Sequence, residues 1–148
     1  MEKAIVRVLV DTCIWSLVLR RQFKDLSVNE TILREEMREL VSDSRAQLIG
    51  PIRQEILSGI RERANFERVR EYLRDFADEP VATSDHELAA KLCNECRAAG
   101  VAGSAVDFLL CALAANRNWS IFTTDRDFKR YSEVFDLSLH SAASPQRA

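Results

Sequence analysis

Short apolar segments alternate with longer segments of helical periodicity along this chain, and this alternation constrains the fold more than any other feature. The first apolar segment, Ile5–Val10, has five apolar residues out of six and predicts a buried strand. Strands separated by helices are typical of a parallel sheet covered on both faces. We therefore expect an α/β fold, a three-layer sandwich with helices on both faces of a central, mostly parallel sheet of four to five strands. The other expected strands are AQLIG, PVAT, WSIFT and DLSLH.

The segments between these strands carry the start and stop signals of helices. Ser27 and Glu30 form a capping box before one helix, and Ser84 with Glu87 repeats the pattern before another. Gly100 is suited to end this second helix, because glycine readily adopts the left-handed conformation that closes many helices. Further helices are expected at TCIWSLVLR, after Pro51, through Phe66, Val69, Leu73 and Phe76, at DFLLCALAANRN and at TDRDFKRY.

Length and composition fit one domain. We assign residues 1–140 of the 148 to it and expect the tail 141–148, SAASPQRA, to be disordered. No apolar run approaches the roughly 20 residues of a membrane helix and the N-terminus lacks a secretion signal, so the expected location is the cytoplasm. The net charge of −2 is unusual for an unaided nucleic-acid binder. Any phosphate chemistry would therefore need local arginines or a bound cation.

The four cysteines suit a reduced compartment, since none lies in a loop-rich disulfide pattern. Cys93 and Cys96 form a C-x-x-C, but no second pair completes a four-thiolate zinc site. His86 shares their helix face and would lie about 15 Å from Cys96 along the axis, too far for one ion. We expect these cysteines to pack in the core.

Four acids are predicted to meet at one edge of the sheet. Asp11 ends the first strand, Glu55 lies about one turn into the helix after the second, and Asp107 begins a strongly apolar helix. Asp125 follows the strand WSIFT, with Asp127 two residues further on. The carboxyl ends of parallel strands and the starts of the following helices occupy the same edge, where α/β proteins bind ligands. Carboxylates gathered there would repel each other unless a hard cation such as Mg²⁺ or Mn²⁺ were bound.

Each acid also has a structural explanation, which the residues alone leave open. Asp11 is placed to cap the first helix, and Asp107 is placed to pair with Ser104 in an S-x-x-D cap. Glu55 would be an ordinary solvated helix acid, and Asp125 and Asp127 would be favoured near a helix start by its dipole. The joint arrangement is harder to explain by capping than any single member.

Other proteins with an aspartate after the first strand are excluded by named residues. A haloacid-dehalogenase-type phosphotransferase requires a second aspartate where this chain has Cys13. A von Willebrand-type metal site requires D-x-S-x-S where this chain has DTCIW. A response-regulator receiver requires a lysine after a late strand, and WSIFTTD offers none.

VLVDTCIW, RQEILSG, SAVDFLLCALA and IFTTDRDF stand in the order and spacing of PIN-domain ribonucleases. Over about residues 5–140 the chain resembles this family, and especially the VapC toxins of VapBC toxin–antitoxin modules. The resemblance implies a PIN-like sandwich and an Mg²⁺- or Mn²⁺-dependent endoribonuclease that forms a homodimer and is inhibited by a small VapB-like antitoxin. Carried over by motif, the family's acidic site falls on Asp11, Glu55, Asp107 and Asp125, with Asp127 as an accessory acid.

Further residues are candidates around this site. The hydroxyls of Thr12, Ser104 and Thr124 are suited to position a carboxylate, and each is equally suited to cap a helix. Two alternatives to a toxin remain: a PIN-type nuclease of RNA processing, or a PIN-like RNA-binding module without catalysis. The basic candidates for RNA contact are Arg20, Arg21, Lys24, Arg53, Arg126, Lys129 and Arg130.

Overall fold

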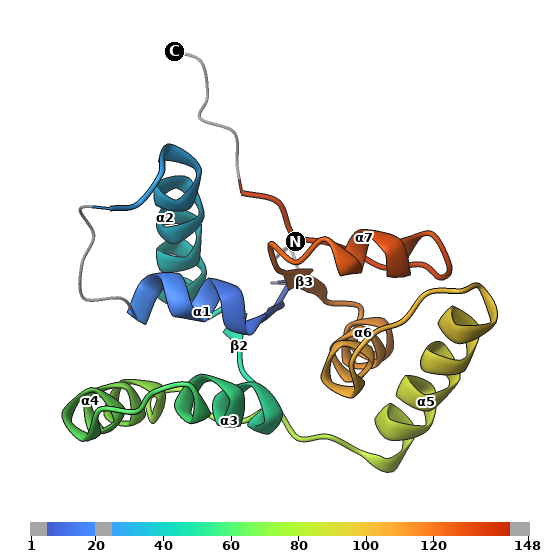
Figure 1. The fold of residues 1–148 in the computed structure, drawn as a ribbon, viewed down its shortest axis with the longest axis horizontal. Helices are drawn as coiled ribbons and strands as arrows, with labels where there is room; N and C mark the ends of the chain where they lie inside the picture. Colours follow the sequence, from blue (N-terminus) through green and yellow to red (C-terminus); the bar gives the residue numbers. More distant parts are fainter. Residues whose placement is uncertain (1–5, 20–24, 143–148) are drawn as a thin grey trace, which may run out of the picture.

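A computed structural model describes residues 6–19 and 25–142, in which a small parallel sheet lies between two groups of helices (Figure 1). Its strands are β1 (Val8–Val10), β2 (Ala46–Gln47) and β3 (Ser120–Phe122), in the order β2-β1-β3. The register pairs Val10 with Phe122, so β1 and β3 end side by side. The predicted α/β architecture with a parallel sheet and helices on both faces is confirmed.

Single bridges extend the sheet at both edges, where the sequence predicted whole strands. Beside β2, Leu48 pairs with Asp78, and beside β3, Ile121 pairs with Leu139. The PVAT strand is wrong in position, because the bridge falls before Pro80, whose missing N–H suits it poorly to continue a ladder. DLSLH is likewise reduced to one bridge. The four to five strand positions exist, but the outer two are single contacts.

Helices occupy most of the described chain, and none of them there is long and apolar enough to cross a membrane. Figure 1 places α1 to α4 on one side of the strands and α5 to α7 on the other. Their bounds are α1 Thr12–Leu19, α2 Val28–Ser42, α3 Gly50–Ser58, α4 Arg63–Leu73, α5 Thr83–Ala98, α6 Ala105–Arg117 and α7 Asp127–Ser132.

Capping contacts explain several helix ends. The predicted box of Ser27 and Glu30 is present at the start of α2. The second predicted box is wrong, because the residue that caps α5 is Ala82, two positions before Ser84, and the Asp85 carboxylate accepts the backbone N–H of Ala82 at 2.8 Å. Gly100 has a φ of +78° just after α5, as expected for a residue that closes a helix.

The core lies between the sheet and both helical groups. Trp15 on α1 is fully buried, and its indole N–H donates to the carbonyl of Val10 at 3.1 Å, which ties the helix to the strand before it. Every residue of α6 from Phe108 to Ala114 is buried. Cys96 is buried and Cys93 partly so, both as free thiols, so the core-packing explanation of the C-x-x-C is confirmed. The predicted disorder of the tail falls mainly on residues 143–148, outside the described residues.

Candidate metal centre

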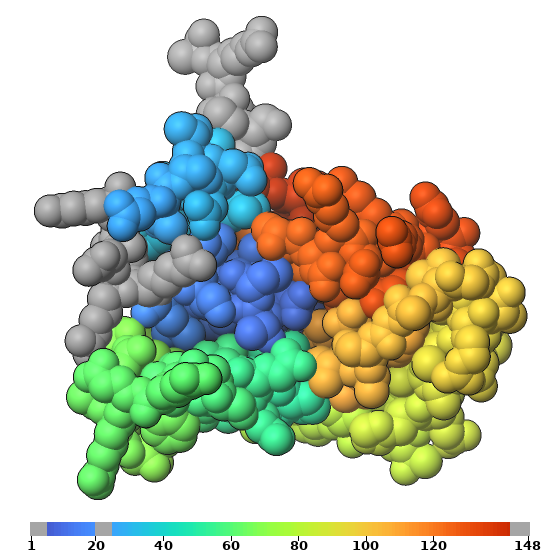
Figure 2. All heavy atoms as spheres, viewed as in Figure 1, coloured from blue at the N-terminus to red at the C-terminus, as the bar shows by residue number. Residues whose placement is uncertain are grey.

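Three of the predicted acids lie where strands end and helices begin. Asp11 directly follows β1, Asp125 lies in the turn between β3 and α7, and Asp107 lies in the first turn of α6. Glu55 lies within α3, as expected. Figure 2 shows the spheres of α1, α3, α6 and the segment from β3 to α7 meeting near the centre of one face of the molecule.

Asp11 is nearly buried, with 8% of its surface exposed, and both of its carboxylate oxygens accept hydrogen bonds. The backbone N–H of Thr12 donates to Oδ1 at 2.8 Å, which is a contact at the start of α1. The hydroxyl of Thr123 donates to Oδ2 at 2.8 Å. The carboxylate therefore stabilises a helix start, as the structural explanation proposed, and it is also fixed against the end of β3.

Asp107, Asp125 and Asp127 form an acidic cluster, in which each carboxylate places an oxygen within 4.8 Å of the other two. The backbone N–H of Asp127 donates to Oδ1 of Asp125 at 2.9 Å, which keeps these two acids together at the start of α7. The resemblance to the PIN family implied only an accessory part for Asp127, whereas in the structure it is a full member of the acidic cluster. Asp11 and Glu55 are not members of this group.

Burial and mutual repulsion disfavour the charged forms of these acids. Burial raises the pKa of Asp11 and of Asp107, although hydrogen bonds from Thr123 and Tyr131 respectively oppose the effect. The charge of Asp125 raises both pKa values further, and the charge of Asp107 also raises that of Asp11. Asp11 lies beside the acidic cluster even though it is not a member, because one hydroxyl, that of Thr123, bonds both the Asp11 carboxylate and the backbone N–H of Asp125. A bound cation would relieve this repulsion.

Thr123 is a site residue that the sequence analysis missed in favour of Thr124. Its hydroxyl donates to Asp11 and accepts the backbone N–H of Asp125 at 3.0 Å, so it connects two of the predicted acids. Thr124 is exposed, and its backbone N–H is directed to the sulfur of Cys13 at 3.4 Å. The strand register identifies Thr123, because the pairing of Val10 with Phe122 places the next residues of both strands, Asp11 and Thr123, side by side. The sequence alone does not reveal this register.

Asp107 is held by residues on either side of it. Ser104 caps α6 by accepting the backbone N–H of Asp107 at 3.1 Å, so the predicted S-x-x-D cap is present. The hydroxyl of Tyr131 donates to Oδ2 of Asp107 at 2.7 Å. Tyr131 was not among the sequence candidates, because a tyrosine in an amphipathic helix gives no sign of a carboxylate partner.

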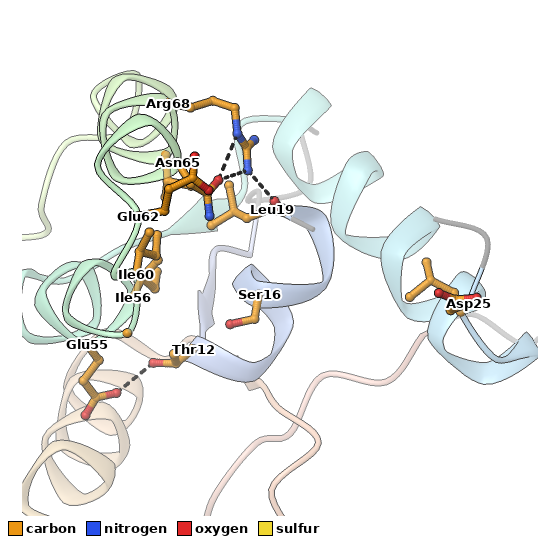
Figure 3. A pocket seen from close by; sticks show the side chains of 13 residues that line it. Thr12, Ser16, Leu19, Asp25, Glu55, Ile56, Ile60, Glu62, Asn65 and Arg68 are labelled. Atoms are coloured by element: carbon orange, nitrogen blue, oxygen red, sulfur yellow. Dashed lines mark hydrogen bonds between the residues drawn. The ribbon is translucent and has the colours of Figure 1, made fainter. Parts of the chain in front are cut away.

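Glu55 is connected to the site through Thr12, whose hydroxyl donates to Oε2 of Glu55 at 2.8 Å (Figure 3). Both residues line a cavity of about 710 Å³ between α1, α3, α4 and the segment before α2. Figure 3 also shows Arg68 held by Asn65 and by the carbonyl of Leu19. Three acids contribute to the lining of this cavity, namely Asp25, Glu55 and Glu62.

The predicted basic residues divide into three groups. Arg126, Lys129 and Arg130 are exposed on or next to α7, near the acidic cluster. Arg53 instead donates to Asp78 at 2.9 Å and to the carbonyls of Leu73 and Phe76, so its guanidinium holds α3 to the segment after α4. Arg20, Arg21 and Lys24 lie outside the described residues.

The donor set of the acidic cluster fits a hard divalent cation. It consists of carboxylate oxygens alone, without imidazole or thiolate, and oxygen donors are those that Mg²⁺ and Mn²⁺ prefer. Cys111 is buried near Asp107 and Asp11, and burial raises the pKa of its thiol, so it stays protonated. The residues present are therefore compatible with the metal that the resemblance implies.

Residues 8–134 match the PIN domain family, and since this match spans most of the chain, the protein belongs to that family. Among curated proteins, no match to the sequence was found. FitAcB from Neisseria gonorrhoeae is similar in structure, with a TM-score of 0.70 and 17% identity over 90% of this chain and 96% of the other. VapBC2 from Rickettsia felis, bound to a DNA fragment from their promoter, has a TM-score of 0.67 and 14% identity over the same shares. At these identities the likeness establishes the fold, and the expected PIN-like sandwich is confirmed.

Proposed function

We propose that the protein is a divalent-metal-dependent endoribonuclease that hydrolyses RNA phosphodiester bonds. The observation that carries the proposal is the convergence of Asp107, Asp125 and Asp127, with Asp11 beside them, at the strand-end edge of a PIN domain. PIN domains are generally nucleases. A module that only bound RNA would have no need to gather these carboxylates against their mutual repulsion.

The acidic cluster would hold an Mg²⁺ or Mn²⁺ ion, together with Asp11 and, as predicted from the sequence, Glu55. When bound, such an ion lowers the pKa of a water molecule and neutralises charge that grows on a phosphate. Thr123 keeps Asp11 and the turn containing Asp125 in a fixed relation. Thr12 orients the Glu55 carboxylate, and Arg126, Lys129 and Arg130 on the exposed surface beside the cluster would bind the RNA backbone.

We further propose that the protein is a toxin of the VapC type, acting in the cytoplasm as a homodimer and neutralised by a small VapB-like antitoxin. The similar structures FitAcB and VapBC2 support this proposal at the level of fold. The cavity next to Glu55 supports it chemically, because its described lining carries three acids, Asp25, Glu55 and Glu62, against one cation, Arg68. A basic antitoxin segment placed there would reach Thr12 and Glu55 and compete with metal or RNA.

The decisive experiment compares RNA cleavage by wild type, Asp125→Asn and Asp136→Asn with and without Mn²⁺. Asp125 and Asp136 are both exposed acids near α7, but only Asp125 belongs to the acidic cluster, so Asp136 is the matched control. Wild type and Asp136→Asn should cleave RNA only with the metal, whereas Asp125→Asn should be inactive while its circular dichroism stays unchanged. Undiminished cleavage by a folded Asp125→Asn would refute the site.

The toxin assignment needs a separate test in cells. Expression of the protein alone should arrest growth and produce RNA fragments, and co-expression of its cognate small antitoxin should restore growth. A PIN-type nuclease of RNA processing would cleave RNA in vitro without arresting growth. A non-catalytic RNA-binding module would bind RNA without metal-dependent cleavage.

A further inference from the structure

The hydroxyl of Tyr131 reaches the acidic cluster from inside the core. Tyr131 lies on α7 with none of its surface exposed, and its hydroxyl donates to Oδ2 of Asp107 at 2.7 Å. A buried tyrosine hydroxyl must find a partner, since leaving it unpaired costs about 1–3 kcal/mol. Its partner here is one of the three carboxylates of the cluster, on a different helix. The contact therefore links the core to the candidate metal centre.

Aromatic packing fixes where that hydroxyl lies. The ring of Tyr131 lies 5.0 Å from that of Phe108 on α6, and 5.2 Å from that of Phe128 in an edge-on arrangement. Phe108 and Phe128 are themselves buried. The ring is thus held from both helices, and close packing leaves the hydroxyl little freedom to leave Asp107.

Gly103 makes room for this arrangement. A Cβ atom at position 103 would collide with Oη of Tyr131 and would lie 2.8 Å from both Cζ of Tyr131 and Cζ of Phe108. Gly100, by contrast, has a positive φ and open space around its Cα, so its reason for being glycine is conformation. Gly103 does not have a positive φ, so backbone conformation does not require glycine at this position. Glycine is required there because a Cβ atom would collide with Tyr131.

We propose that Tyr131 is a positioning residue for metal binding: its hydroxyl holds the Asp107 carboxylate in the orientation in which it shares a divalent cation with Asp125 and Asp127. Gly103 is the residue that permits this approach. The inference rests on the proposed function and deepens it, since it assigns the orientation of one cluster member to a residue that touches neither metal nor RNA.

Charge repulsion within the acidic cluster explains why Asp107 needs a hydrogen bond to hold its orientation. Asp107 faces the negative charges of Asp125 and Asp127 within the cluster, so an unrestrained side chain would turn away from them. A hydrogen bond from a neutral donor to a carboxylate opposes that rotation and adds no competing positive charge. Groups that orient metal ligands in this way typically contribute 10–100-fold to metal affinity.

Mn²⁺ affinity tests the proposal directly, by titration calorimetry and by the electron spin resonance signal of free Mn²⁺. Tyr131→Phe keeps the ring and removes only the hydroxyl, and Tyr72→Phe makes the same change at the chain's other tyrosine. We expect Tyr131→Phe to weaken Mn²⁺ binding roughly 10–100-fold, and Tyr72→Phe to leave it unchanged. If Tyr131→Phe lowers only the melting temperature of the metal-free protein and binds Mn²⁺ as wild type does, the hydroxyl is merely structural and the proposal is wrong.

Gly103→Ala provides a second variant that retains the hydroxyl but displaces it. It should also weaken Mn²⁺ binding, and it decides the matter if Tyr131→Phe does not fold; unchanged affinity in a folded Gly103→Ala would overturn the proposal. Mn²⁺ binding by the wild-type protein distinguishes failure of the positioning role from failure of the proposed function. If wild type binds Mn²⁺ and only the variants contradict expectation, the positioning role fails alone. If wild type does not bind Mn²⁺, the proposed function fails and this inference fails with it.

Discussion

Thr123 donates its hydroxyl hydrogen to Oδ2 of Asp11 at 2.8 Å, across 112 positions of sequence. The same hydroxyl oxygen accepts the backbone N–H of Asp125 at 3.0 Å. One side chain thus fixes the carboxylate that ends β1 and the turn that follows β3. The geometry of the site depends on this bridge between neighbouring strand ends, in addition to the acids themselves.

Thr123→Val should therefore impair the candidate metal centre more than the same substitution at the next residue, Thr124→Val. Valine keeps the shape of threonine but can neither donate to Asp11 nor accept from Asp125. We expect kcat/KM for RNA cleavage and the affinity for Mn²⁺ to fall about 10–100-fold. Thr124→Val is the matched control, since its side chain is exposed and takes no part in this bridge. Equal losses in both variants would show that the bridge is not what positions the carboxylates.

The metal-free protein should become more stable when the charge of Asp11 is removed. Burial raises the pKa of Asp11 in the folded state above its ordinary value, and a raised carboxyl pKa means that folding is disfavoured as pH rises through it. At neutral pH the charge of Asp11 is therefore a stability cost. Asp11→Asn should raise the melting temperature of the metal-free protein by a few degrees, where 1 kcal/mol corresponds to roughly 2–4 °C.

With Mn²⁺ bound, wild type should have a higher melting temperature than Asp11→Asn, the reverse of the order without metal. A ligand bound only by the folded protein stabilises it, so wild type should gain melting temperature with millimolar Mn²⁺ while Asp11→Asn gains little. Differential scanning calorimetry with and without the metal measures both effects. A metal-free Asp11→Asn that melts well below wild type would mean that the hydrogen bonds from Thr12 and Thr123 outweigh the burial of the charge.

The strand-end edge could be predicted from the sequence because it follows from topology. The expected strands ending before Asp11 and before Asp125 are each followed by a helix, which places these two acids at one edge, and Asp107 is expected there because it begins a helix. The alternation of strands and helices does not determine which way the side chains at that edge point. Asp127 joins the cluster because its backbone N–H bonds to Asp125, and a turn of that kind has no sequence signature distinct from an ordinary helix start.

The misplaced elements have local physical causes. Ser84 and Glu87 have the composition of a capping box, but α5 starts earlier because Asp85 is drawn into contacts with Ala82 and Arg117. Arg117 comes from α6, so no inspection of the α5 segment alone could find this partner. Tyr131 could not be identified from its own segment for the same reason, because its partner Asp107 lies 24 positions away on another helix.

Asp85 should make stability depend on acid pH. It is 2% exposed and accepts hydrogen bonds from Arg117 at 2.9 and 3.0 Å, from Asn116 and from Ala82. The arginine contacts above all hold the pKa of Asp85 well below its usual value of 3.8, although burial opposes them. A carboxyl with a lowered folded-state pKa contributes stability above its unfolded pKa and loses that contribution as pH falls through the folded one.

Urea unfolding from about pH 2 to 7 measures this dependence. At pH 7 Asp85→Asn should lose about 1.5–3 kcal/mol, the range for hydrogen bonds to charged groups, because Arg117 is left with its main partner uncharged. The difference from wild type should shrink steadily below about pH 4. Asp136→Asn, an exposed acid, should follow wild type throughout. A gap between Asp85→Asn and wild type that is as large at acid pH as at neutral pH would assign the loss to packing and not to charge.

The exposed basic residues beside the cluster should act on RNA binding and not on the chemical step. Arg126, Lys129 and Arg130 lie on or next to α7, which begins with Asp127 of the acidic cluster, so RNA bound there would pass over them. Phosphate contacts contribute affinity by releasing counterions, which makes that affinity dependent on salt. Each alanine substitution should reduce the slope of log K against log salt by roughly 0.7 for single-stranded RNA.

Binding is measured in the Asp125→Asn background, so that cleavage does not deplete the RNA, and kinetics in the otherwise wild-type protein. Lys129→Ala and Arg130→Ala should raise KM and leave kcat within about twofold, since they remove binding common to substrate and transition state. Lys91→Ala is the control, because Lys91 is also exposed but lies on α5. A fall in kcat without a change in KM would place these side chains at the reacting phosphate. An effect of Lys91→Ala equal to theirs would mean that RNA responds only to net charge, and the RNA path over α7 would be wrong.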